Sequence, residues 1–294
     1  MSSGLTVKGT TKLLGVIGDP VTHSFSPVMH NAAIAHLGVD YVYVPLPVVA
    51  HQLKEALLGF DAIDVRGFNI TIPHKQAIMP FLDTISDTAQ AIGAVNTVWK
   101  TESGWSGTNT DMDGFLAPLY SMERSWSQAK AVVLGNGGAA RAVVAGCTAM
   151  GIPSICVVGR SRDKLTQFEQ SWQGSTVNPA LSTYTWEQLP DSLAGADLII
   201  NTTPIGMVPN IHASPLSDMS VSQIRPDAIA YDLIYTPSPT LFLQQATEQG
   251  AIAIDGTEML VQQGAKALEI WLQQPVPTEV MRTALLAQLE QKQV

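Results

Sequence analysis

The sequence predicts a two-domain α/β protein in which each domain contains a mainly parallel β-sheet. A chain of 294 residues is long enough to form two domains. Short apolar segments alternate with helical patterns in the first third of the chain and again after Gln128, as in parallel sheets. A glycine-rich turn joins one of these segments to an alanine-rich helix, which is typical of nucleotide-binding domains. We expect residues 1–114 and 257–294 to form one domain and residues 115–256 the other, with the functional site in a cleft between them.

The first alternating series defines the N-terminal domain. The predicted strands are 13–18, 41–47 and 67–72, with helices at about 27–37 and 50–60. Because helices separate these strands, the strands should run parallel and be covered on both faces. Residues 94–100 and 105–108 flank the turn-forming stretch Glu102-Ser103-Gly104, which predicts a β-hairpin.

The second series defines the other domain. Its predicted strands are 131–134, 155–158, 197–201, 228–234 and 251–254, and its helices include 139–150 and 239–249. These strands are short, rich in β-branched residues and almost free of charge, so we expect them to be buried on both faces of the sheet. Two helices, at about 258–273 and 277–290, end the chain, and we expect them to return to the first domain.

The composition limits the classes of partner. A net charge of −9 argues against nucleic acid and anionic membranes, since both bind basic surfaces. The sequence contains no apolar run of about 18 residues that would span a membrane. Cys147 and Cys156 lie within apolar segments, which predicts reduced core residues and a cytoplasmic protein. The histidines show no metal-ligand spacing with cysteines or carboxylates, so we expect no metal.

The glycine-rich turn has the form G-x-G-x-x-A and directly follows residues 131–134. Gly135 permits the tight turn, Gly137 leaves room for a pyrophosphate, and Ala140 allows the helix to pack closely on the strand. The N-terminus of the helix then binds phosphate through free N–H groups. The alternative is a glycine turn that holds no ligand. The agreement of strand, turn, helix and next strand favours a Rossmann-type cofactor domain.

The end of the next strand indicates which dinucleotide is bound. Enzymes that use NAD place an acidic residue there to bind the ribose 2′-hydroxyl. This chain has Arg160, Ser161 and Arg162, with Lys164 just beyond, and these groups suit a 2′-phosphate. The alternative is a solvated basic start of a helix, in which Asp163 is an early helical residue. Three basic residues at this turn, in a chain with only 16 Lys and Arg, favour NADP.

Small polar residues gather at the predicted strand ends of the first domain. Ser24 and Ser26 precede a helix and could cap it or bind a carboxylate at its N-terminus. Asn69 and Thr71 should point to one face of a strand by its period of two, with Lys75 just beyond. Taken singly, these residues are more often turns or caps than ligands. Together with Asn96 and Asp111 they suit a polyhydroxylated acid.

The ordered motifs resemble the shikimate dehydrogenase family over nearly the whole chain. They are S-x-S-P at 24–27, N-x-T-x-P-x-K at 69–75, G-A-x-N-T at 93–97, G-x-N-T-D at 107–111, G-x-G-G-A at 135–139, N-x-T-x-x-G-M at 201–207, D-x-x-Y-x-P at 232–237, and Asp255-Gly256 with 259–263. Gly159 departs from the family, in which many NADP-using members have Asn before the Arg.

The resemblance implies reversible, NADP-dependent reduction of 3-dehydroshikimate to shikimate, a step of aromatic amino acid biosynthesis, with Lys75 and Asp111 as the catalytic pair. The implied substrate ligands are Ser24, Ser26, Asn69, Thr71, Lys75, Asn96, Asp111, Tyr235 and Gln263. The implied cofactor ligands are Gly135, Asn136, Gly137, Gly138, Ala139, Arg160, Ser161, Lys164, Thr202, Ile234 and Gly256. A quinate or dual quinate/shikimate dehydrogenase is one alternative, and a non-catalytic regulator that binds NADP or a metabolite is another. A homodimer is compatible with the sequence.

Overall fold

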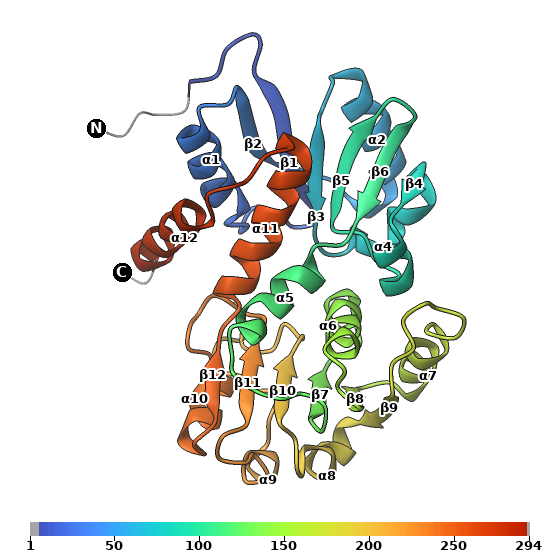
Figure 1. Ribbon diagram of the computed structural model, residues 1–294, viewed down its shortest axis with the longest axis vertical. Coiled ribbons are helices and arrows are strands. Elements are labelled where there is room, and N and C mark those ends of the chain that lie inside the picture. Colours follow the sequence, from blue (N-terminus) through green and yellow to red (C-terminus); the bar gives the residue numbers. More distant parts are fainter. Residues whose placement is uncertain (1–5, 293–294) are drawn as a thin grey trace. The chain divides into compact units, whose positions relative to one another are not determined.

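The computed structural model describes residues 6–292, which divide into two compact units. Unit 1 comprises Met1–Gly114 and Leu260–Val294, and unit 2 comprises Phe115–Met259. Each unit contains one six-stranded sheet with helices packed against it (Figure 1). The predicted two-domain α/β fold with mostly parallel sheets is therefore confirmed.

The sheet of unit 1 has the strand order β2-β1-β3-β5-β6-β4. These strands are β1 (Lys12–Gly18), β2 (Tyr41–Pro47), β3 (Gly67–Ile70), β4 (Thr84–Ile85), β5 (Thr97–Thr101) and β6 (Gly104–Thr108). Strand β1 pairs in parallel with β2 and β3, while β5 is antiparallel to both β3 and β6. The hairpin predicted around Glu102 is confirmed as β5–β6.

Strand β3 is shorter than the sequence predicts. It ends at Ile70 rather than Ile72, and Thr71 lies in the turn that follows. The turn is held by the backbone, because the N–H of Thr71 donates to Ile17 O at 2.9 Å and the N–H of His74 donates to Thr71 O at 3.0 Å. The prediction that Asn69 and Thr71 share a face of one strand is therefore wrong, since the strand period does not extend to Thr71.

The helices of unit 1 come from both ends of the chain. They are α1 (Ser26–Leu37), α2 (Leu53–Ala62), α3 (His74–Ala77), α4 (Asp87–Ile92), most of α11 (Thr257–Leu272) and α12 (Thr278–Lys292). Short 3₁₀ turns cover Ala50–Gln52 and Met79–Phe81. The red helix α12 lies beside the blue helix α1 (Figure 1). Trp271 of α11 donates its indole N–H to Val98 O at 2.9 Å and lies directly against Gly67, where a side chain would collide with it.

The sheet of unit 2 is parallel throughout, in the order β12-β11-β10-β7-β8-β9. Its strands are β7 (Lys130–Leu134), β8 (Ser154–Gly159), β9 (Leu181–Thr185), β10 (Leu198–Asn201), β11 (Ile229–Asp232) and β12 (Ile252–Ile254). Its helices are α6 (Gly138–Ala149), α7 (Arg162–Gln170), α8 (Leu189–Leu193), α9 (Asp218–Val221) and α10 (Leu241–Glu248), with a 3₁₀ turn at Trp186–Gln188. The chain passes from unit 1 to unit 2 within α5 (Asp111–Tyr120) and returns within α11.

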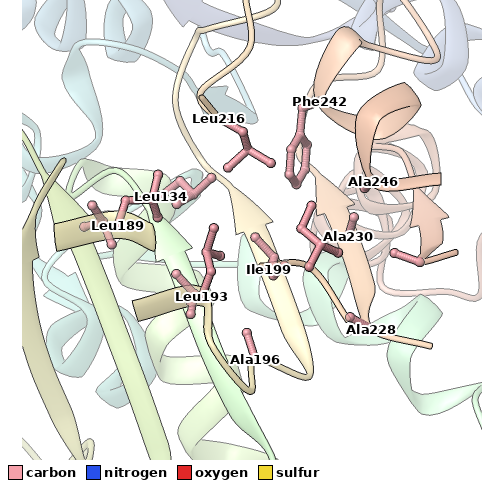
Figure 2. Close-up of a cluster of buried hydrophobic side chains, with 14 of the residues drawn as sticks. Leu134, Leu189, Leu193, Ala196, Ile199, Leu216, Ala228, Ala230, Phe242 and Ala246 are labelled. Atoms are coloured by element: carbon pink, nitrogen blue, oxygen red, sulfur yellow. The ribbon is translucent and has the colours of Figure 1, made fainter. Parts of the chain in front are cut away.

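The core of unit 2 forms where the sheet packs on its helices. Figure 2 shows Leu134 and Ile199 of the central strands facing Leu193 of α8, with Phe242 of α10 over the same layer. Strands β7, β8, β10 and β11 are almost completely buried, as the sequence predicts. The same expectation is wrong for β12, because this strand lies at the edge of the sheet and its Ile252 is 48% exposed.

Both cysteines are free and buried in unit 2. Burial raises the pKa of the Cys147 thiol to about 12 and also raises that of Cys156. The neutral thiols pack in the core as small apolar groups. No helix within residues 6–292 is long and apolar enough to cross a membrane.

Candidate active site

The centre of the polar cluster in unit 1 is an ion pair between Lys75 and Asp111. Lys75 lies on the short helix α3 after β3, and Asp111 is the first residue of α5. The ammonium nitrogen is 2.6 Å from Asp111 Oδ2, and the two side chains are 18% and 8% exposed. Because both side chains are largely removed from solvent, water screens their attraction less than it does in a surface pair, and the two groups have less freedom to separate. The arrangement places one proton donor and its counter-charge at a fixed position.

Asn96 fixes the second oxygen of Asp111. Its side-chain N–H₂ donates to Asp111 Oδ1 at 2.8 Å, and its Oδ1 accepts from the backbone N–H of Thr110 at 2.8 Å. The same N–H₂ lies 3.4 Å from Gln263 Oε1 on α11. Asn96 is only 2% exposed, so these bonds form in a poorly solvated place where they restrict the rotation of the carboxylate.

The turn before α5 holds the backbone of Asp111. Asn109 accepts the N–H of Asp111 at its Oδ1, at 3.0 Å, and donates its own N–H₂ to Ala94 O at 3.0 Å. Such a bond from a side chain to the N–H two residues on is an Asx turn, the geometry that Asn favours. Asn109 lies inside the G-x-N-T-D motif, but this supporting role is not apparent from the sequence.

Asn69 is brought into this cluster, but as a support. Its N–H₂ donates to Asn96 O and to Thr97 Oγ1, both at 3.2 Å, and its Oδ1 accepts from the hydroxyl of Tyr43 at 2.7 Å. Both amide hydrogens are thus used within the protein. The hydroxyl comes from the buried Tyr43, which the sequence motifs do not include.

Ser24 and Ser26 lie after β1, next to the start of α1. The N-cap of α1 is Phe25, and no side chain in the described part of unit 1 caps this helix, so the alternative that a serine is the N-cap is wrong. Ser24 Oγ instead accepts the N–H of Ser26 at 3.3 Å. Thr71 contacts this region through Gly18, against which its methyl group packs.

The implied substrate ligands divide between the units. Hydrogen bonds connect five of them within unit 1. Thr71 directly follows β3, while Ser24 and Ser26 lie between β1 and α1 and at the first position of α1, respectively. The five are Asn69, Lys75, Asn96, Asp111 and Gln263. Tyr235 belongs to unit 2, in the loop after β11, and its assignment stays a prediction.

In unit 2 the glycine turn between β7 and α6 has the geometry that a dinucleotide requires. Gly135 has φ +104°, and a Cβ there would lie 2.7 Å from Thr202 Oγ1. A Cβ at Gly137 would meet nothing within 4 Å, so the backbone is open on that side. No described side chain caps α6, whose first residues are Gly138 and Ala139, so its first N–H groups are free for phosphate. These residues fit a dinucleotide.

Three further implied ligands shape the loops around this turn. Thr202 donates its hydroxyl to Leu134 O at 2.7 Å and supports the turn from behind. The carbonyl of Ile234 accepts the N–H of Gly256 at 3.0 Å. A side chain at Gly256 would collide with the carbonyl oxygen of Leu233, so only glycine fits there.

A buried network that the sequence analysis missed joins the ends of β10 and β11. Asn201 donates to Asp232 Oδ1 at 3.0 Å, and the hydroxyl of Thr240 donates to Asp232 Oδ2 at 2.7 Å. The N–H of Ile234 also donates to Asp232 Oδ1, at 3.0 Å. Burial raises the pKa of Asp232 to about 6 even though these bonds favour the charged form. Asn201 and Asp232, the first residues of the N-x-T-x-x-G-M and D-x-x-Y-x-P motifs, are thus buried residues that hold loops in place.

The basic cluster lies at the start of α7. Ser161 is the N-cap and accepts the N–H of Lys164 at 3.4 Å, which leaves its hydroxyl hydrogen free to donate. Asp163 is in the first helical turn, as predicted. Arg160 and Lys164 are exposed, with no ion pair to any described acid. Within residues 6–292 no group of three or more His, Cys, Asp or Glu could hold a metal.

The glycine turn, the uncapped helix and the buried ion pair define the protein as a dinucleotide-dependent oxidoreductase. Two family models match the chain, the shikimate dehydrogenase substrate binding domain at residues 16–98 and the shikimate 5′-dehydrogenase C-terminal domain at 256–286. A shikimate dehydrogenase (NADP(+)) of Gloeothece citriformis is 60% identical over 279 residues, which cover 95% of this chain and 97% of the relative. The chain belongs to the shikimate dehydrogenase family, which confirms the resemblance.

Solved structures agree with this assignment. A crystal structure of a shikimate dehydrogenase in complex with NADP+ has a TM-score of 0.88 and 36% identity, with 98% of this chain and 99% of that chain covered. The Thermus thermophilus shikimate 5-dehydrogenase in complex with NADP(H) and shikimate has a TM-score of 0.82 and 32% identity, with 94% and 99% covered.

Proposed function

We propose that the protein catalyses the reversible, NADP-dependent reduction of 3-dehydroshikimate to shikimate. The observation that carries the proposal is the buried Lys75–Asp111 pair, fixed by Asn96, in a chain that also has the glycine turn of a dinucleotide domain. Relatives that bear the name shikimate dehydrogenase (NADP(+)) support it at 50% to 60% identity.

In this mechanism Lys75 supplies a proton. NADPH, when bound, provides the hydride, and the carbonyl oxygen of the substrate becomes an alkoxide that needs a proton. The ammonium of Lys75 donates that proton, and Asp111 keeps the ammonium oriented through the 2.6 Å contact. In the reverse direction the neutral lysine takes the proton back from the substrate hydroxyl.

The other polar groups of unit 1 orient the substrate. Ser24 and Ser26, at the start of α1, receive the carboxylate through their hydroxyls, and the positive end of the helix dipole also favours an anion there. Thr71, Asn96 and Gln263 bind the ring hydroxyls, while Asn69 acts through Asn96 rather than on the substrate. Tyr235, in the loop after β11 of unit 2, is a further proposed substrate ligand.

Unit 2 binds the cofactor. The N–H groups at the start of α6 hold the pyrophosphate, and Arg160, Ser161 and Lys164 bind the 2′-phosphate. Thr202, Ile234 and Gly256 shape the loops on which the remainder of the cofactor rests. The reduced, buried cysteines favour a cytoplasmic enzyme, and a homodimer is to be tested by light scattering.

The test is spectrophotometric. Purified protein is mixed with shikimate or quinate and with NADP⁺ or NAD⁺, and the absorbance of the reduced nicotinamide is followed. Fast reduction of NADP⁺ by shikimate is expected. Preference for quinate or NAD⁺ would overturn the specificity, and binding of NADP⁺ without any turnover would indicate a regulator instead of an enzyme.

A further inference from the structure

Asn136 and Gly159 form a contact across the cofactor side of unit 2. Gly159 is the last residue of β8, where it is buried, and Asn136 lies in the glycine turn after β7. A Cβ built on Gly159 would lie 3.2 Å from Asn136 Oδ1 and 2.9 Å from Leu165 Cδ2. The side chain of Asn136 therefore extends over the end of β8 into space that a larger residue at position 159 would need.

This location matters because of what the end of the second strand does in dinucleotide domains. The side chain there reaches the adenosine ribose, and an acid accepts a hydrogen bond from the 2′-hydroxyl. In this chain position 159 has no side chain, and the group beside it comes from the preceding turn. Asn136 is only partly buried, and its amide makes no hydrogen bond to any residue in the described chain. The Asn136 amide is thus free to bind a ligand at the strand end that leads into the exposed Arg160.

We propose that Asn136 contacts the 2′ substituent of the adenosine ribose and is a determinant of cofactor specificity. The amide N–H₂ donates to a 2′-phosphate, while Arg160 supplies the positive charge. A carboxylate in the same place would repel the phosphate and accept from a 2′-hydroxyl instead. The inference rests on the proposed use of NADP and assigns the discrimination to a residue outside the basic cluster.

The test is ligand binding without turnover. Calorimetric titration compares adenosine 2′,5′-bisphosphate, which carries the 2′-phosphate, with adenosine 5′-monophosphate, which has a 2′-hydroxyl. For Asn136→Asp we expect the affinity for the bisphosphate to fall about thirtyfold or more, because like charges then face each other. The affinity for the monophosphate should stay within about threefold of the parent, since its 2′-hydroxyl can donate to the new carboxylate.

Two further variants separate charge from shape. Asn178→Asp places the same charge on an exposed residue of unit 2 and should leave both affinities unchanged. Gly159→Ala introduces a methyl group against Asn136 Oδ1 and should lower the bisphosphate affinity about tenfold by displacing the amide. Thermal unfolding of each variant checks that unit 2 is folded.

The outcomes are distinct. Parent-like binding of the bisphosphate by Asn136→Asp overturns the inference, and so does an equal loss of affinity for both ligands, because the effect would not concern the 2′ substituent. A selective loss for the bisphosphate supports it. Absence of shikimate oxidation with NADP⁺ would instead overturn the proposed function, whatever these titrations give.

Discussion

His30 should make the stability of unit 1 depend on pH between about 4 and 6.5. Its ring is completely buried, stacks on Tyr43 at 4.1 Å between ring centroids, and donates from Nδ1 to Ser26 O at 2.8 Å. Burial lowers the pKa of His30 from 6.5 to about 4. The folded protein therefore keeps the ring neutral at a pH where the unfolded chain is already protonated.

The sign and size follow from linkage. Because the unfolded state binds the proton more readily, the stabilisation is fully present above pH 6.5 and is lost as the pH falls toward 4. At about 1.4 kcal/mol per pKa unit the whole effect is about 3 kcal/mol, of which about 2 kcal/mol is lost between pH 7.5 and pH 5. Replacing His30 by Gln removes the titration and keeps a donor that can reach Ser26 O.

The assay is urea unfolding of the parent and His30→Gln at pH 7.5 and pH 5. The parent should lose about 2 kcal/mol more than the variant between the two pH values, whatever His30→Gln costs at pH 7.5. His36 is exposed near the end of the same helix, and His36→Gln is the control that should behave like the parent. Equal losses in the parent and His30→Gln would refute the reasoning.

Three other predictions concern the site and its supports. Lys75→Ala should lower turnover at least about a hundredfold while leaving the affinity for NADPH, measured by fluorescence titration, within about twofold; unchanged turnover would remove Lys75 from the mechanism. The pKa of Asp232 is raised from 3.8 to about 6, so the folded state holds this proton more tightly than the unfolded chain does. Unit 2 should therefore lose stability as the pH rises from about 3.8 to about 6. The variant Asp232→Asn can keep the bonds to Asn201 and Ile234. Its stability in urea unfolding should depend less on pH and stay within about 1 kcal/mol of the parent at pH 7.5. A loss above about 3 kcal/mol would show that the charge itself is needed. Gly256→Ala should lower stability in the same assay by about 2 kcal/mol, because the new methyl group would collide with Leu233 O. The control Gly59→Ala lies in an open position of α2 and should be neutral or stabilising. Equal effects of the two variants would contradict the steric argument.

The elements that a local pattern determines were predictable. The buried strands β7, β8, β10 and β11 were expected because their β-branched, uncharged residues favour a strand locally. Their buried positions in the sheet favour the same structure. Strand β9 was missed, since it lies at the edge of the sheet and its sequence LSTYT has no continuous apolar run. The end of β3 was misplaced for a related reason, because the apolar Ile72 suggested two more strand residues while the chain already turns at Thr71.

The site was predictable as a set of residue types but not as a set of contacts. The motifs contain Lys75, Asp111 and Asn96, and the structure connects them by hydrogen bonds within unit 1. The supporting roles of Tyr43 and Asp232 could not be predicted, although Asp232 begins a motif, because their partners come from other segments of the chain. Whether a polar residue binds a ligand or holds a loop depends on those partners, and spacing along one chain does not reveal them.

The return of α11 to unit 1 has a consequence for synthesis of the chain on the ribosome. Trp271 packs on Gly67 and Val98, and Gln263 contacts Asn96, so unit 1 gains these contacts only after the 145 residues of unit 2 have been made. Unit 2 is continuous in sequence and can fold as it emerges. The sheet of unit 1 therefore stays uncovered at Gly67 until α11 has been synthesised. The packing of α11 and α12 is the last event in the folding of the candidate catalytic unit.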